Sequence, residues 1–326
     1  MRKSTKLWLT IATSLIALGC VTFTATACAI GWDFKKFSTV TLETNTYEVS
    51  DPFQAVSIEV DTEDVTFLPS DNGQCKVVCF EDINVKHSVT VENDTLTVKA
   101  QDERKWYDYL TLMGSGNPTI TVYLPQTEYT ALSIETDTGD VKIPKDFTFD
   151  SVTVSGDTND VECFASVKNT LTVKVTTGDI FLKNLTAGTV DLTTTTGDIE
   201  LTSVSVENDL KIAVDTGDVE LSDVTCKNFI STGDTGDLEM KNVLVTEKMS
   251  IERDTGDVDF ERCDAGEIFI KTSTGDVEGS LLTEKNFQAD SNTGKKHIPD
   301  TKVGGKCEIV SSTGDIFITL AVTANE

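Results

Sequence analysis

The sequence predicts an all-β fold: a right-handed parallel β-solenoid, similar to a β-helix, with coils of about 19–20 residues and an N-terminal transmembrane helix before it. Three observations predict it. A tripeptide related to Thr-Gly-Asp recurs every 19 or 20 residues, apolar residues flank each copy in pairs two apart, and an uncharged stretch lies near the N-terminus. A repeat this short cannot bury a core alone, so it has to stack on its neighbours.

The recurring tripeptide marks ten expected corners of the coil. Nine contain glycine, and Thr158-Asn159 fills the one gap. We expect positive φ at each corner, because glycine adopts it without steric cost and asparagine tolerates it better than most residues. The expected corner residues are Gly139, Asn159, Gly178, Gly197, Gly217, Gly236, Gly256, Gly275, Gly294 and Gly314.

The residues between corners alternate as strands do. Around Gly197, the apolar pair Val190 and Leu192 comes before the corner and the pair Ile199 and Leu201 follows it. A period of two indicates strands with one buried face rather than helices. Each coil should therefore contain two or three short strands that pair in parallel with the coils on either side.

The chain divides into five expected segments. They are a basic cytoplasmic segment (1–6), a transmembrane anchor or signal segment (7–32), a linker (33–50), irregular first coils and a cap with a loop at 101–118 (51–129), and the regular solenoid (130–326).

The stretch from Leu7 to Trp32 carries no charge and is long enough to span a bilayer. Basic residues precede it, so we expect a single-pass cell-membrane protein with an extracellular C-terminal domain. Two alternatives stay open, and both separate the solenoid from a membrane-spanning anchor. Cleavage near Ala25-Thr26-Ala27 would give a secreted protein, and lipid attachment at Cys20 would give a lipoprotein.

The formal net charge of -27 disfavours nucleic acid and anionic membrane surfaces as partners. The eight cysteines do not suggest a disulfide framework, because Cys163, Cys226, Cys263 and Cys307 fall on inward positions where other repeats have Val or Leu. Arg253 next to Asp254 suggests a local ion pair.

An aspartate follows every expected corner except the one before Lys295. Stacked about 5 Å apart, these carboxylates would repel one another, so something must offset the charge. Amide groups of the turns are one solution. Bound Ca²⁺ is the other, with a second acidic column contributing. The calcium candidates are Asp215, Asp218, Asp234, Asp237, Asp254 and Asp257.

Catalytic chemistry has little support in the sequence. Asp-Thr-Gly also occurs in aspartic proteases, but here it recurs as a structural period, without the paired lobes that bring two carboxylates together. His87 and His297 are the only histidines, and no motif surrounds either. We therefore expect no enzyme, no catalytic residue and no cofactor apart from calcium. A polysaccharide-active β-helix enzyme is the less favoured alternative.

Three aromatic residues, Trp106, Tyr107 and Tyr109, lie in the expected loop at 101–118. Loops on a rigid scaffold often carry function, so these rings are candidate ligand contacts. Alternatively, they fold back and cover the open end of the solenoid core.

A hydrophobic N-terminal segment, a strand ending in Leu124-Pro125 and serial Thr-Gly-Asp-Val/Ile coils together resemble the DUF4097 family of bacterial β-strand-repeat proteins, which are candidate adhesins. The resemblance covers roughly residues 50 to 320. It implies a non-enzymatic cell-surface β-solenoid that acts in adhesion or as a binding scaffold for an unknown protein or glycan, with no ligand-binding residue to carry over. The alternative is a regulatory or sensory accessory of the cell envelope that partners a membrane protein.

Overall fold

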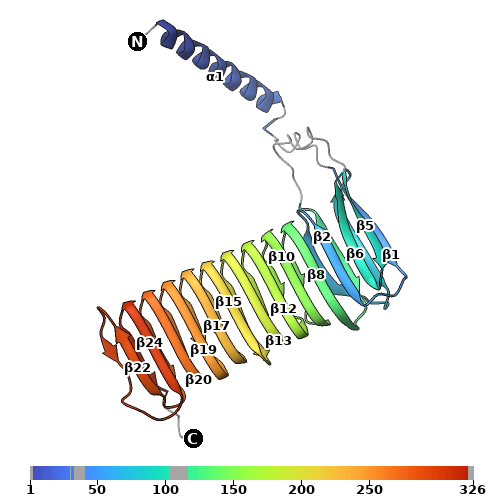
Figure 1. Ribbon diagram of the computed structural model, residues 1–326. Helices are drawn as coiled ribbons and strands as arrows, with labels where there is room; N and C mark the ends of the chain where they lie inside the picture. Colours follow the sequence, from blue (N-terminus) through green and yellow to red (C-terminus); the bar gives the residue numbers. More distant parts are fainter. Residues whose placement is uncertain (1–2, 30, 33–40, 103–116, 322–326) are drawn as a thin grey trace.

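The computed structural model describes residues 3–29, 31–32, 41–102 and 117–321. It consists of an N-terminal helix, α1 (Lys3–Ala29), and a β-solenoid that forms one row of stacked strands (Figure 1). The expected ligand-loop residues Trp106, Tyr107 and Tyr109 lie outside the described residues.

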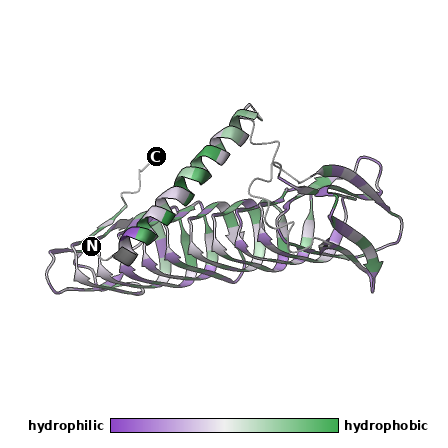
Figure 2. Cartoon of the chain, turned by 90° about the horizontal axis from the view of Figure 1, so that it is seen from above, coloured by the Kyte–Doolittle hydropathy of each residue, from purple (hydrophilic) through white to green (hydrophobic). Residues whose placement is uncertain are grey.

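Helix α1 is apolar on all sides and none of its most apolar window is buried, unlike an amphipathic helix that packs on a core. Its segment Thr5–Ala29 is long and apolar enough to cross a membrane. Figure 2 shows this helix as mainly hydrophobic, whereas hydrophobic and hydrophilic residues alternate along the solenoid strands.

Antiparallel strands cover the N-terminal end of the solenoid. β1 (Leu42–Val49) pairs with β4 (Cys75–Asp82), β4 pairs with β7 (Thr119–Leu124), and β5 (Val85–Glu92) pairs with β6 (Thr95–Asp102). β1 lies in the segment expected to be a linker. It forms a strand because Tyr47 and Val49 alternate with polar residues and pack against the core.

The first coils do not stack in the order of the sequence. One coil contains β2 (Ala55–Val60) and β3 (Asp64–Pro69), and the next along the chain contains β6 and β7. β2 pairs with both β6 and β8, and β3 pairs with both β7 and β9. The coil that comes first in the chain is therefore covered on both sides.

The regular solenoid follows with parallel pairing throughout. Its strands are β8 (Glu128–Thr138), β9 (Val141–Ile143), β10 (Thr148–Thr158), β11 (Val161–Cys163), β12 (Ser166–Thr177), β13 (Ile180–Thr196), β14 (Ile199–Val206), β15 (Asp209–Thr216), β16 (Val219–Ser222), β17 (Thr225–Thr235), β18 (Leu238–Lys241), β19 (Leu244–Thr255), β20 (Val258–Thr274), β21 (Val277–Leu281), β22 (Asn286–Ser291), β23 (Lys296–His297), β24 (Lys306–Thr313) and β25 (Ile316–Leu320).

The corners lie in single file along the solenoid. The threonine before each corner is in register with that of the neighbouring coil, for example Thr177 with Thr196 and Thr196 with Thr216. Eight corner glycines have φ between +123° and +154°. The prediction of positive φ was wrong for Asn159 and Gly294, both within the described residues. Asn159 instead turns its side chain inward, where its Nδ2 donates to the carbonyl oxygen of Gly139 over 2.8 Å.

The last coils are also out of sequence order. β24 pairs with β20 on one side and with β22 on the other, and β25 likewise lies between β21 and β23. The Gly294 coil therefore forms the outermost layer, and the Gly314 coil, although later in the chain, lies inside it. At each end of the solenoid, the coil that comes first or last in the chain is thus covered by the coil next to it in the sequence.

Inward side chains form one continuous apolar cluster from Val56 to Ile318. All eight cysteines lie within the described residues and are free thiols. Cys163, Cys226, Cys263 and Cys307 are each at most 4% exposed. They occupy core positions as small apolar side chains.

Candidate functional site

The aspartates after the corners form a hydrogen-bonded ladder. Each carboxylate Oδ1 accepts the backbone N–H of the equivalent residue in the neighbouring coil, over 2.7–3.2 Å. The series runs Asp64, Asp140, Asp160, Asp179, Asp198, Asp218, Asp237, Asp257, Asp276, Asp315 and ends at the N–H of Lys295. Lys295 belongs to the outermost layer, beyond which no further described coil offers a backbone N–H. A carboxylate at this position would therefore have no amide donor.

The calcium candidates belong to two different sets. Asp218, Asp237 and Asp257 are members of this ladder and already accept amide hydrogens. Asp215, Asp234 and Asp254 lie two residues before the corner glycines and are exposed to solvent. The amide ladder supplies the stabilisation that the stacked charges require.

Arg253 does not pair with Asp254 among the described residues. Its side chain lies inside the solenoid, 3% exposed, and its Nη2 donates to Ser231 Oγ over 3.0 Å. Gly233 provides the space, because an added Cβ there would lie 1.8 Å from Arg253 Nη1. Burial lowers the pKa of Arg253, although the charges of Asp218 and Asp237 oppose this effect.

A groove of about 640 Å³ lies on the outer face of the later coils. Five acidic residues line it, and four of them lie in register on adjacent strands: Glu220, Glu239, Asp259 and Glu278. The fifth, Glu261, pairs over 3.3 Å with Lys241, which also lines the groove. Phe317 follows the four in register and is 45% exposed. Burial, followed by neighbouring carboxylates, raises the pKa of Asp259. A row of like charges in a groove attracts cationic groups.

The densest cluster of chemically active side chains is buried at the N-terminal end. It begins with Glu63, which takes the corner position of the first coil: an added Cβ on Gly139 would lie 2.5 Å from its carbonyl oxygen. The Glu63 carboxylate turns inward, where Oε2 accepts the N–H groups of Asp61 and Thr62 over 3.1 and 2.9 Å.

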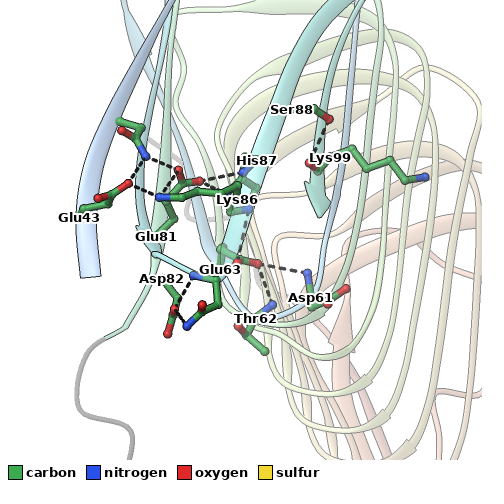
Figure 3. Close-up of polar contacts among 12 residues, drawn as sticks. Glu43, Asp61, Thr62, Glu63, Glu81, Asp82, Lys86, His87, Ser88 and Lys99 are labelled. Carbon is green, nitrogen blue, oxygen red and sulfur yellow. Dashed lines mark hydrogen bonds and ion pairs between the residues drawn. The ribbon is translucent and has the colours of Figure 1, made fainter. Parts of the chain in front are cut away.

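The other members come from β4 and β5, which are joined by the turn at Ile83 and Asn84. Cys79 and Glu81 lie two residues apart on the buried face of β4, and His87 lies on the buried face of β5. His87 Nδ1 is 2.5 Å from Glu81 Oε2, and its Nε2 is 3.4 Å from Glu63 Oε1. Figure 3 shows the imidazole between the two carboxylates.

Further contacts fix Glu81. Its Oε2 accepts the backbone N–H of His87 over 2.9 Å, and its Oε1 accepts Asn45 Nδ2 from β1 over 2.6 Å. Lys86 Nζ is 3.9 Å from Oε1, at the rim of the cluster, and it also contacts Glu43. Side chains or backbone from β1, β4 and β5 therefore meet at this carboxylate, and the first corner reaches the cluster through Glu63 and His87.

Burial and charge shift the ionisation of the cluster in opposite directions. Burial alone lowers the pKa of His87, but hydrogen bonds and charges from Glu63 and Glu81 raise it above its usual value. Burial alone raises the pKa of Glu63, but His87 and the amides of Thr62 and Asp61 outweigh it, so the net shift is downward. Burial, then Glu81 and Glu63, raises the pKa of Cys79 to about 12.

This cluster can hold a proton between His87 and Glu81, or a cation among the donor atoms of Cys79, Glu81 and His87, which all lie within 4.8 Å of one another. The sequence did not predict this cluster, because no motif surrounds His87. Two departures from the repeat pattern did indicate buried charge. Glu63 replaces the corner glycine, and Glu81 continues the inward positions of Cys75, Val77 and Cys79 with a charge.

The Thr-Gly-Asp coils and the solenoid built from them define a class of protein, a β-strand-repeat solenoid. The chain belongs to the Toastrack DUF4097 family, whose profile matches residues 53–213 and 207–325. No curated protein matches this chain.

Three solved structures are similar to it, each over 86% of this chain. A candidate adhesin from Parabacteroides distasonis is 11% identical, is covered over 98% of its length and has a TM-score of 0.49. A candidate lipid-binding protein from the same species is 14% identical, with 98% covered and a TM-score of 0.49. A candidate adhesin from Bacteroides fragilis is 15% identical, with 97% covered and a TM-score of 0.41.

Proposed function

We propose that this protein is a non-enzymatic binding scaffold of the bacterial cell surface, anchored in the membrane by α1 and acting in adhesion to a protein or glycan. The observation that carries the proposal is the separation of an apolar helix from a self-contained β-solenoid. Leu7 and Trp8 are 60% and 70% exposed, whereas the solenoid core is closed by its own strands.

An exposed apolar helix of this length is stable in a bilayer and unstable in water. The basic residues Arg2, Lys3 and Lys6 precede it, which favours a cytoplasmic N-terminus and an external solenoid. The acidic surface keeps such a domain soluble and away from anionic lipids. Together these features suit a rigid display element better than a catalyst.

Display is tested by protease treatment of intact cells that express the full chain with a cytoplasmic N-terminal tag. We expect the solenoid to be removed from outside while the tag stays protected. Protection of the solenoid in intact cells, with digestion only after lysis, would contradict the proposed orientation.

Cross-linking on intact cells then separates the candidate roles. Adhesion predicts capture of host or matrix protein or glycan, with binding retained when α1 is replaced by another anchor. The alternative role, an envelope accessory, predicts capture of a neighbouring integral membrane protein that depends on α1 itself.

Variants in the groove test whether the ligand binds there. The double variant Glu239→Gln/Asp259→Asn removes two adjacent charges from it, and Glu207→Gln/Glu284→Gln removes two exposed charges elsewhere. If the ligand carries cationic groups that dock in the groove, only the first pair weakens binding. Equal binding by both pairs would place the contact on another face.

A further inference from the structure

We propose that Cys79, Glu81 and His87 bind a zinc ion at the N-terminal end of the solenoid. The three side chains supply one thiol sulfur, one carboxylate oxygen and one imidazole nitrogen, and these atoms lie within 4.8 Å of one another. Ligands of a tetrahedral zinc ion are roughly 3.3–3.8 Å apart, given bond lengths of about 2.0–2.3 Å. The donors are therefore within about 1 Å of the spacing that zinc requires.

The type of donor selects the metal. Ca²⁺ and Mg²⁺ prefer oxygen ligands, whereas a thiolate with an imidazole favours zinc. Three protein donors leave one tetrahedral position, which a water molecule or the second oxygen of Glu81 can occupy. The side chains of Glu81 and His87 are fully buried, so an ion bound there would be shielded from solvent.

Groups around the cluster would orient the ligands. His87 presents Nδ1 to Glu81 and Nε2 to Glu63, and Glu63 is itself fixed by the amides of Asp61 and Thr62. A metal-bound histidine commonly donates its second ring N–H to a carboxylate in this way. Asn45 fixes one oxygen of Glu81 and leaves the other directed at His87.

The charge of the cluster is compatible with exchange of protons for zinc. Zinc is bound by a thiolate, a carboxylate and a neutral imidazole nitrogen, so Cys79 and His87 would bind it in their deprotonated forms. The divalent cation would offset the negative charges of the Cys79 thiolate and the Glu81 carboxylate, so no unpaired charge would remain among the three ligands.

Zinc binding would link β4 to β5 across their connecting turn, beside Glu63 of the first coil. We therefore expect zinc to raise the melting temperature of the chain and to bind more tightly as pH rises, because two protons compete with it.

The test uses the purified full chain in detergent, stripped with chelator and dialysed, then titrated with Co²⁺ and with Zn²⁺. We expect one cobalt ion per chain with a thiolate-to-cobalt charge-transfer band in the near ultraviolet, and displacement of cobalt by zinc. Cys79→Ser should lose the band, and His87→Gln and Glu81→Gln should weaken binding at least tenfold. Cys75→Ser, on the same buried face of β4, is the matched control and should keep the band.

Absence of the band in the unmodified chain would overturn the proposal, whether or not the variants fold. A band of equal strength in Cys79→Ser would do the same, because it would come from another thiol. Metal uptake without the band would show only adventitious binding by the acidic surface.

Discussion

At the eight corners with positive φ, glycine is required for two separate reasons. Backbone conformation is the first, because φ between +123° and +154° is strained for any residue with a Cβ. Close approach is the second: an added Cβ on Gly197 would lie 2.1 Å from the carbonyl oxygen of Gly178 in the adjacent coil. The sequence predicts the first reason from the Thr-Gly pair, whereas the second depends on how closely the coils stack.

We expect Gly197→Ala to lower the free energy of unfolding by more than the roughly 1–3 kcal/mol of backbone strain alone, because the neighbouring carbonyl must also move. The measurement is a urea or thermal unfolding curve. Gly73→Ala is the control, because Gly73 has φ +72° but open space around it. Equal losses in the two variants would show that close approach contributes nothing.

The buried cluster shows where single residues could and could not be predicted. Glu63 and Glu81 each break a local pattern, one at a corner and one on an inward strand position, so their burial was open to prediction. Their meeting with His87 was not. It depends on the turn between β4, which pairs with β7, and β5, which pairs with β6, and on the first corner lying beside that turn, so that Glu63 reaches His87.

We expect the stabilisation by His87 in the metal-free chain to depend on pH. Its folded pKa is raised, so its contribution is complete below the unfolded value of 6.5 and is lost as pH rises through the folded value. The folded pKa of Glu63 is lowered, so its contribution is present above 4.5 and is lost as pH falls through the folded value. Cys79 and Glu81 also face the imidazole, and Lys86 lies 3.9 Å from Glu81 at the rim of the cluster.

Unfolding of the unmodified chain and of His87→Gln across pH measures this effect, since the difference cancels most other titrating groups. We expect the difference to be largest between about pH 4.5 and 6.5 and to shrink at alkaline pH. A difference that is independent of pH would mean that folding leaves the pKa of His87 unchanged, and a difference that falls as pH drops below about 6.5 would mean that the folded histidine stays neutral.

At the scale of elements, the strands of the regular coils follow from their alternation, and the aspartate ladder explains why a charge recurs after every corner. Each ladder carboxylate accepts a hydrogen bond from an amide of the next coil, which offsets part of the repulsion between neighbouring carboxylates. The antiparallel cap strands were less predictable. Their side-chain alternation is the same in parallel and antiparallel sheets, and only pairing distinguishes them.

Replacement of a ladder aspartate separates hydrogen bonding from cation binding. Asp237→Ala removes the acceptor for the Asp257 N–H and should cost about 1–2 kcal/mol. Asp237→Asn keeps an acceptor oxygen and removes a repelling charge, so we expect little loss. Thermal melts with and without added CaCl₂ measure both variants. A large loss in Asp237→Asn, together with calcium stabilisation of only the unmodified chain, would favour the cation interpretation.

At the scale of the whole molecule, the stacking order at both ends departs from the chain order. The sequence spacing of Gly294 and Gly314 matches the other repeats, so the period alone does not reveal the exchange. Lys295, the exception in the aspartate column, marks the outermost layer. At the N-terminal end, the coil of β6 and β7 likewise covers the coil of β2 and β3, which precedes it in the chain.

We expect hydrogen exchange to follow stacking order rather than sequence order. Amides of β24 lie between two parallel neighbours, β20 and β22, whereas β22 has β24 as its single strand partner among the described residues, apart from one bridge between Asn286 and Lys302. β24 should therefore exchange more slowly than β22, although it is nearer to the C-terminus. Mass spectrometry of peptic fragments measures this. Faster exchange in β24 would contradict the exchanged stacking order.

The uniform register between regular coils also provides a way to change the length of the solenoid. Because consecutive coils meet through the same threonine alignment and aspartate contact, duplicating one 19- or 20-residue unit in the middle would create only joints that already exist. Each added copy would lengthen the column by about 4.8 Å and leave both closed ends untouched. Copy number alone could therefore adjust how far the distal tip stands from its point of attachment.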